Sequence, residues 1–191
     1  MKFLGIDSSS SAIGLARRNL AHNLNQGSLL RSAREEVYFA IGDIFGTAYG
    51  AGKGHDWDVL VANPPYISPN AFRATTTRSV SKWEPKSALV PPEYMPSQSD
   101  VEVGDAFYPR LLEIANEVGA KVFLVEVADL DQAKRVAGLA LKQRKWASCE
   151  IWRDCPGQEA EATSHVPIRG HNVPILGTGN GRAVFAYNDW V

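Results

Sequence analysis

One stretch, residues 58–66, constrains the fold of this chain more than any other, because an apolar strand there runs directly into two prolines. Val59–Ala62 is short, apolar and β-branched between polar flanks, which is typical of a strand buried on both faces of a parallel sheet. The strand must end at Asn63, since Pro64 and Pro65 remove two backbone donors and fix two φ angles. Open α/β sheets bind ligands at the carboxyl ends of such strands, so the sequence predicts a ligand site here.

The residues after this strand offer hydrogen-bond acceptors and an aromatic face to a planar amino group. The Asn63 amide oxygen and the Pro64 carbonyl can each accept a proton, and Tyr66 adds a flat ring. An amide or an exocyclic base amine that gives both protons to these acceptors points its lone pair at an electrophile. The positive charge that develops on its nitrogen is then stabilised. The pattern favours amino-group methylation, with a plain loop after a strand as the alternative.

The segment Asn63-Pro64-Pro65-Tyr66, after an Asp-x-hydrophobic strand, resembles the signature of class I S-adenosylmethionine (AdoMet, S-adenosyl-L-methionine) dependent amino-methyltransferases. More narrowly, it is similar to the release-factor glutamine N5-methyltransferase (HemK-like) family, and the likeness covers roughly residues 4 to 140. The resemblance implies an α/β fold, a three-layer Rossmann-like methyltransferase sheet that is mostly parallel with a reversed last strand. It implies AdoMet as the cofactor and a translation release factor as the protein substrate.

The resemblance also assigns roles within this segment. Asn63, Pro64, Pro65 and Tyr66 would form the catalytic segment. Asn63, Pro64 and Tyr66 would bind the glutamine side-chain amide of the substrate, and Asn63 would also contact the cofactor. No strong general base is needed before attack by such a nitrogen, so the segment requires no histidine or carboxylate of its own.

Two further strand ends supply the residues that the resemblance assigns to AdoMet. A short apolar strand ends at Asp7 and is followed by a helical face. An acid in this position can accept hydrogen bonds from ribose hydroxyls, although it can equally cap a helix. The resemblance implies that Asp7, with Ser8 beside it, binds the ribose, and that Asp43 and Ile44 lie against the adenine. The strands that precede these residues are expected at 2–6 and 37–41.

A long polar segment follows the Asn-Pro-Pro-Tyr stretch and is expected to lie on the substrate side. Residues 68–100 are rich in Ser, Thr and Pro and show neither a helical nor an alternating period, which predicts a long functional loop without regular structure. Within it, Glu84-Pro85 resembles the Glu-Pro pair of the family. By that resemblance, Glu84 and Pro85 are expected to bind the substrate.

The second half of the chain predicts alternating helices and strands. Asp105 is expected to cap a helix, a strand follows at 121–127, and Asp129 caps the next helix. Glu126 and the Asp-Gln-Ala run that includes Gln132 also match the family, and we interpret that match as structural.

The last third contains the only glycine-rich run that resembles a phosphate- or AdoMet-binding loop. This run, residues 177–181, precedes a strand instead of leading from a strand into a helix, so the helix amides that would bind a ligand are absent. A hairpin turn is the better interpretation. The larger stretch 154–181 is expected to be a long loop.

Composition narrows the classes of function. With 191 residues, 45% hydrophobic and 21% charged, the chain is expected to form a single globular methyltransferase domain over residues 1–191. The net charge of −1 argues against direct nucleic-acid binding, and no apolar run is long enough for a membrane span. Cys149 and Cys155 have no histidine at a metal-ligand spacing, so no metal is expected. Free thiols fit an intracellular compartment, mitochondrial or cytoplasmic.

Compared with the family, the sequence begins at the second strand. The first strand with its glycine-rich AdoMet loop and the amino-terminal helical domain have no counterpart, so we expect an amino-terminally incomplete domain that binds AdoMet weakly by itself. Three functions stay open. They are methylation of a release-factor glutamine, amino-methylation of adenine or cytosine in nucleic acid, and a non-catalytic role as the partner subunit of an active methyltransferase.

Overall fold

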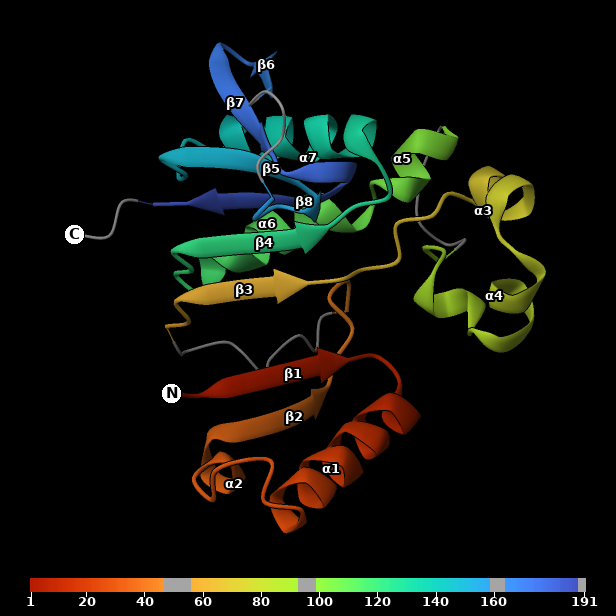
Figure 1. Ribbon diagram of the computed structural model, residues 1–191, viewed down its shortest axis with the longest axis vertical. Helices are drawn as coiled ribbons and strands as arrows, with labels where there is room; N and C mark the ends of the chain where they lie inside the picture. Colours follow the sequence, from red (N-terminus) through yellow and green to blue (C-terminus); the bar gives the residue numbers. More distant parts are fainter. Residues whose placement is uncertain (47–55, 93–98, 159–163, 189–191) are drawn as a thin grey trace. The chain divides into compact units, whose positions relative to one another are not determined.

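The computed structural model describes residues 1–46, 56–92, 99–158 and 164–188, in two compact units that span 1–55 and 56–191 (Figure 1). Each unit has its own sheet, and each is described by itself. None of the helices in these ranges combines the length and the apolar character that a membrane span needs.

The first unit is a strand, helix, strand arrangement. Strands β1 (Phe3–Asp7) and β2 (Val37–Ile41) pair in parallel, with Asp7 opposite Ile41. Between them lie α1 (Ser10–Asn25) and the short α2 (Ala33–Glu36). Helix α1 begins where it does because the Ser9 side chain accepts the Ala12 N–H at 3.3 Å. The parallel pairing brings the ends of β1 and β2 to the same edge, as the sequence predicts.

The second unit contains a six-stranded sheet in the order β3-β4-β8-β5-β7-β6. Strands β3, β4, β5 and β7 point one way, whereas β8 and β6 are antiparallel to their neighbours. The mixed, mostly parallel direction and the reversed last strand are therefore confirmed. The strands span Val59–Ala62 (β3), Val122–Glu126 (β4), Ser148–Cys155 (β5), Ser164–Ile168 (β6), His171–Leu176 (β7) and Thr178–Tyr187 (β8).

Two amphipathic helices, α6 (Phe107–Glu117) and α7 (Leu130–Lys142), form the core with this sheet. Their buried side chains follow a helical period, and the strands bury alternate residues such as Phe123 and Val125, both fully buried. Each such apolar side chain contributes about 1.5–3 kcal/mol of burial free energy. Asp129 caps α7 by accepting the Gln132 N–H at 2.8 Å, as predicted.

The prediction that Val59–Ala62 is buried on both faces is wrong. Val59 is 49% exposed and Val61 is 67% exposed. Within the described residues β3 pairs on one side only, with β4, so it is an edge strand of this sheet. A β-branched run predicts that a strand forms, but it does not reveal where in the sheet the strand lies.

The prediction of a loop without regular structure over residues 68–100 is also wrong. This segment forms α3 (Pro69–Thr75), α4 (Arg78–Trp83) and the 3₁₀ turn η1 (Lys86–Ala88), and α5 (Asp100–Gly104) begins at its end. Ser68, Thr77 and Ser99 each accept a backbone N–H at a helix start. The abundance of Ser and Thr therefore reflects capping of short helices, which are too short to show a period.

Asp105 does not cap the following helix. It lies at the carboxyl end of α5, and the position before α6 is Ala106. The Asp105 carboxylate instead accepts hydrogen bonds from Arg135 Nε at 2.6 Å and from Gln132 Nε2 at 2.9 Å. A long-range pair with α7 has replaced the local cap.

Residues 154–181 are not a single loop, because β6, β7 and the start of β8 fall within the described part of this range. Nor is 177–181 a hairpin turn: β7 and β8 lie on opposite sides of β5, so the chain crosses the end of β5 between them. Gly177 makes the crossing at φ +83°, where an added Cβ would lie 2.2 Å from the Cys155 carbonyl oxygen. Only glycine permits this close approach.

We expect Gly177→Ala to destabilise the protein well beyond the cost of its positive φ. Gly170 has the same backbone conformation, φ +84°, with no atom within 4 Å of an added Cβ. Gly170→Ala should therefore cost only the left-handed strain of about 1–2 kcal/mol. Gly177→Ala should cost a further ~1–3 kcal/mol of steric overlap. Urea unfolding of both variants measures the difference, and equal midpoints would contradict it.

Candidate active site

The Asn-Pro-Pro-Tyr segment leaves the sheet where β3 ends at Ala62. Pro64 is buried and Asn63 is exposed. The far end of the segment is fixed by Ile67 N–H, which donates to the Leu89 carbonyl at 2.9 Å. Neither the Asn63 amide nor the Pro64 carbonyl makes a hydrogen bond within the described residues. Two acceptors at the carboxyl end of the strand therefore have no partner among the described residues.

A cavity of about 420 Å³ is lined in part by Asn63. It lies along the ends of β3, β4, β5 and β8, which all contribute side chains to its wall. The wall combines an apolar floor with two carboxylates and one guanidinium, so it can accept a ligand that carries both N–H groups and carbon atoms. Its lining is Val61, Ala62, Asn63, Leu124, Glu126, Trp152, Asp154, Arg182 and Ala183.

Tyr66 is anchored to this cavity by its hydroxyl group, which donates to Glu126 Oε1 at 2.6 Å. Burial, the hydrogen bond to Glu126 and the charge of Glu126 raise the pKa of Tyr66 to about 12. Glu84 raises this pKa further and Arg182 lowers it, so both charged groups act on Tyr66. The phenol is therefore protonated at neutral pH, which excludes it as a general base there and leaves its ring as a fixed, neutral surface.

Arg182 is held on the cavity wall by two acceptors. Its Nε donates to Asp154 Oδ1 at 2.7 Å and its Nη1 to the Ala128 carbonyl at 3.1 Å. Asp154 also accepts the Asn180 backbone N–H at 2.8 Å. That hydrogen bond, followed by the one from Arg182, lowers the pKa of Asp154. The guanidinium charge is thus largely balanced by its own partner.

The first unit gathers the residues predicted for AdoMet at the carboxyl edge of β1 and β2. Asp7 Oδ1 accepts the Ser9 N–H at 2.7 Å, and Asp43 Oδ1 accepts the Phe45 N–H at 3.0 Å. Both carboxylates are exposed, and within the described residues the second oxygen of each accepts no hydrogen bond. Ribose hydroxyls and an adenine amino group are donors, so these two acceptors fit the cofactor chemically.

The structure thus brings together the predicted residues in two sets. Asp7, Ser8, Asp43 and Ile44 lie in the first unit, and the Asn-Pro-Pro-Tyr segment with Glu84 and Pro85 lies in the second. Pro85 is exposed and begins η1.

Asn63 is the one residue of this cavity wall that was predicted as a site residue. The charged and aromatic residues of the wall were not predicted: Glu126, Trp152, Asp154 and Arg182. The sequence does place Glu126 at the end of a strand, which is the position where a functional carboxylate is expected. The interpretation of Glu126 as merely structural is therefore incomplete, because it contacts the predicted catalytic tyrosine.

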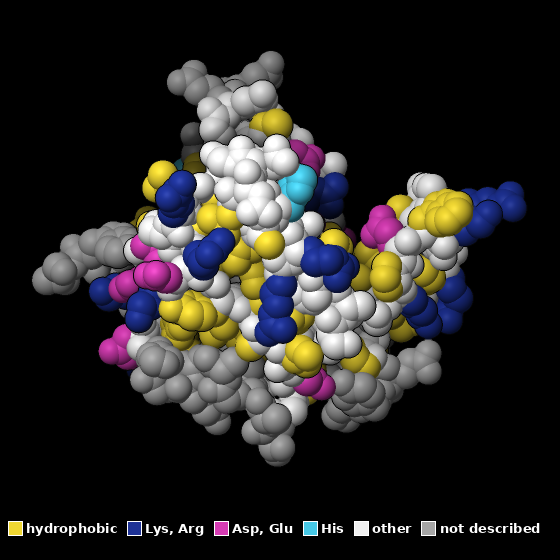
Figure 2. Space-filling model, turned by 90° about the horizontal axis from the view of Figure 1, so that it is seen from below, with side chains coloured by type: hydrophobic (Ala, Val, Ile, Leu, Met, Phe, Trp, Pro, Cys, Tyr) yellow, Lys and Arg dark blue, Asp and Glu magenta, His cyan; other side chains and the backbone are white. Residues whose placement is uncertain are grey.

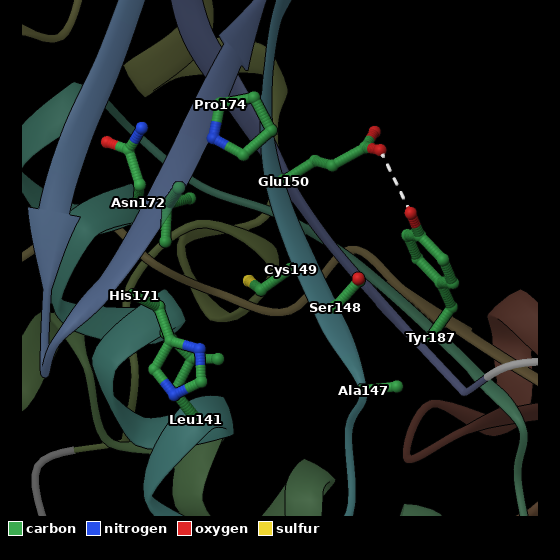
Figure 3. Close-up of a pocket in the computed structure, with 10 residues that line it drawn as sticks. Leu141, Ala147, Ser148, Cys149, Glu150, His171, Asn172, Pro174 and Tyr187 are labelled. Atoms are coloured by element: carbon green, nitrogen blue, oxygen red, sulfur yellow. Dashed lines mark hydrogen bonds between the residues drawn. The ribbon is translucent and has the colours of Figure 1, made fainter.

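A second cavity, of about 150 Å³, lies between β5 and β7 (Figure 3). Its lining includes Cys149, Glu150 and His171 but no Lys or Arg. Cys149 is buried there, and its burial, with the nearby charge of Glu150, raises the pKa of its thiol to about 12. The Tyr187 hydroxyl donates to Glu150 at 3.4 Å. Across the parts of the chain that the structure describes, no group of three or more His, Cys, Asp or Glu residues is arranged to hold a metal ion.

Three curated proteins that are similar in sequence share one name. A release factor glutamine methyltransferase from Chlorobaculum tepidum is 37% identical over 87 residues, which cover 45% of this chain and 26% of that protein. The Fusobacterium nucleatum enzyme is 28% identical over 169 residues, covering 88% of this chain and 41% of that protein. The Bacillus subtilis enzyme is 29% identical over 168 residues, covering 82% and 54%. This chain is similar in sequence to release factor glutamine methyltransferases.

The predicted resemblance to release factor glutamine methyltransferases is confirmed, but it covers only part of the length of those proteins. The chain spans between 26% and 54% of the length of these three relatives. No protein-family model matches it. The catalytic domain of hMettl16, solved in complex with MAT2A 3′UTR hairpin 1, aligns with 97% of this chain and 55% of its own, with a TM-score of 0.57 and 10% identity. At that identity the likeness shows the fold alone, which is the Rossmann-like methyltransferase fold.

We expect Glu126→Gln to lower the pKa of Tyr66 from about 12 without returning it to 10, since burial, the largest cause, remains. The signal of Tyr66 is isolated by subtracting the alkaline absorbance titration of each protein's Tyr66→Phe partner. Because the folded-state pKa is raised, the stability that Tyr66 contributes is present below pH 10 and is lost as the pH rises through about 12. An unchanged pKa in the variant would show that the Glu126 charge does not act on Tyr66.

Proposed function

We propose that this chain is the catalytic part of an AdoMet-dependent methyltransferase that methylates the side-chain amide of a glutamine in a translation release factor. One observation carries the proposal. Asn63 and Pro64 offer two acceptors that have no partner among the described residues, and they come just before Tyr66, whose ring Glu126 holds in place. The names of the relatives supply the substrate class.

The acceptor chemistry follows from the properties of an amide nitrogen. Its lone pair is delocalised into the carbonyl, so the nitrogen attacks only when something stabilises the positive charge it gains. With both N–H protons donated to Asn63 and Pro64, two fixed oxygens stabilise that charge, and the lone pair, which is perpendicular to the amide plane, is aimed at the methyl donor. The Tyr66 ring holds the plane against rotation, and Pro65 keeps the backbone between them stiff.

The donor is assigned to the first unit. Asp7 and Ser8 would hold the ribose of AdoMet, and Asp43 with the Ile44 backbone would hold the adenine. AdoMet, when bound, supplies an electrophilic methyl group on sulfur. Glu84 and Pro85 are assigned to the substrate, and Glu84 already acts electrostatically on Tyr66.

We expect Asn63→Ala, in a form of the protein that transfers methyl groups, to lower kcat by ~10²–10³. AdoMet affinity should stay within a few fold, because Asn63 is assigned mainly to the acceptor. A methyl-transfer assay and isothermal titration on the same variant separate the two effects. Asn172→Ala, at an exposed asparagine of β7, is the matched control and should change neither. Turnover near the wild-type rate in Asn63→Ala would contradict the orientation mechanism.

A second candidate function, amino-methylation of a base in RNA or DNA, is favoured by one surface. Arg73, Arg78, Lys82 and Trp83 are all exposed on α3 and α4, and Lys82 Nζ lies 5.2 Å from the centre of the Trp83 ring. Helices α3 and α4 form a lobe at the right of Figure 2, where several Lys and Arg side chains are drawn in dark blue. Cations around an exposed aromatic ring are also how proteins bind single-stranded nucleic acid.

A labelling experiment decides between the two substrates. We expect radioactive AdoMet to label a release-factor fragment that contains Gly-Gly-Gln, and not the same fragment with alanine in place of the glutamine. Single-stranded RNA and duplex DNA should stay unlabelled. Labelling of nucleic acid alone would move the assignment to the second candidate, and stoichiometric binding to another methyltransferase without turnover would favour a partner subunit.

A further inference from the structure

Gln132, on the first turn of α7, is the only polar residue that is buried in the described ranges, with 3% of its surface exposed. Burying an amide costs free energy unless its hydrogen bonds are replaced. A leucine of similar size would fill the same space at no such cost. The partners of this amide therefore indicate what the polar group is for.

The two ends of the amide serve different parts of the protein. Oε1 accepts the Ala128 N–H at 2.7 Å, which completes the start of α7. It also lies 3.3 Å from the Tyr108 hydroxyl, whose one proton has a shorter acceptor in the Glu126 carbonyl at 2.9 Å. The two protons of Nε2 are shared among three oxygens of more distant segments, all within hydrogen-bond distance. These are Asp105 Oδ1 at 2.9 Å, the Gly104 carbonyl at 3.1 Å and the Tyr66 carbonyl at 3.3 Å.

Tyr66 is consequently held at both of its ends. Its hydroxyl donates to Glu126, and its carbonyl accepts from Gln132. The same peptide plane is fixed on its other side by Ile67 N–H, which donates to the Leu89 carbonyl at 2.9 Å. A ring fixed at its hydroxyl alone could still swing with its backbone, whereas one fixed at both ends cannot.

We propose that Gln132 is a positioning residue for methyl transfer, which sets the place of the Tyr66 ring through the Tyr66 carbonyl. The proposal rests on the proposed function, in which that ring carries the acceptor amide. Gln132 is buried and is not part of the cavity wall, so it acts through Tyr66. Asp105 supports it from the other side, because the Asp105 carboxylate is itself held by Arg135 at 2.6 Å.

The chemistry of the amide allows its two roles to be separated. Gln132→Glu keeps an oxygen for the Ala128 N–H and the Tyr108 hydroxyl, so the start of α7 is preserved. It removes at least one of the two donors shared by Tyr66, Gly104 and Asp105, because a carboxyl group carries one proton when neutral and none when ionised. Gln132→Leu removes both roles. Val136→Ala, at a fully buried position of the same helix, is the matched control for general loss of packing.

The first measurement is hydrogen exchange on the 191-residue chain, which needs no activity. We expect the peptide that covers residues 63–67 to exchange ~10-fold or more faster in Gln132→Glu and Gln132→Leu, after correction for the Val136→Ala control. Exchange at 63–67 no faster than in the control would overturn the proposal.

The second measurement is methyl transfer by an active form of the protein. We expect kcat to fall by ~10- to 10²-fold in both Gln132 variants, with AdoMet affinity within about two-fold of the wild type. Val136→Ala should lose stability without this fall in kcat. An accelerated exchange with kcat unchanged would also overturn the positioning role.

The two measurements, hydrogen exchange and methyl transfer, distinguish a failure of this proposal from a failure of the proposed function. If the wild-type protein transfers no methyl group to the Gly-Gly-Gln fragment, the proposed function fails. The exchange experiment still decides whether Gln132 holds the Tyr66 peptide, and unaccelerated exchange would reject the inference whatever the substrate.

Discussion

The hydrogen bond from the Tyr66 hydroxyl to Glu126, at 2.6 Å, is the contact on which the candidate site depends. It joins the segment that leaves β3 to the end of β4, and so converts two neighbouring strand ends into one wall of a cavity. The prolines make the segment stiff, but stiffness alone does not say where the ring lies. Glu126 supplies that information, and the raised pKa of Tyr66 shows that the phenol keeps its proton.

A second set of hydrogen bonds links helix α7 to the backbone of Tyr66. Asp105 is drawn towards α7 by Arg135, and Gln132 spans the space between the α5–α6 junction and Tyr66. Residues far apart in sequence thereby share one hydrogen-bonded network around a buried amide. Disrupting such a network destabilises the fold, because each donor or acceptor left unpaired in it costs about 1–3 kcal/mol. The Asn-Pro-Pro-Tyr segment has no regular secondary structure of its own, so its position depends on these contacts from a helix and a strand end.

Most of the fold and part of the site could be predicted from the sequence. Strong local signals gave reliable results: the apolar strands, the Asp129 cap and the segment after Ala62 lie where periodicity and proline chemistry place them. Long-range facts could not be predicted. Asp105 was expected to cap a helix and instead pairs with Arg135, 30 residues away. The exposure of Val61 and the crossing at Gly177 depend on strand order, which no local pattern encodes.

Electrostatics around Tyr66 bear on the choice between a protein and a nucleic-acid substrate. Arg73, Arg78 and Lys82 on the α3–α4 lobe could neutralise about three phosphates, which is a modest, salt-sensitive gain. The ring itself is surrounded by negative charge, since Glu126 and Glu84 both raise its pKa. Arg182, the cation that lowers this pKa, is already paired with Asp154 at 2.7 Å. A nucleotide would bring its phosphates towards these carboxylates, whereas a glutamine side chain is neutral and donates N–H groups. The charge next to the ring therefore favours an amide over a base, although the charge on the lobe alone would favour the opposite.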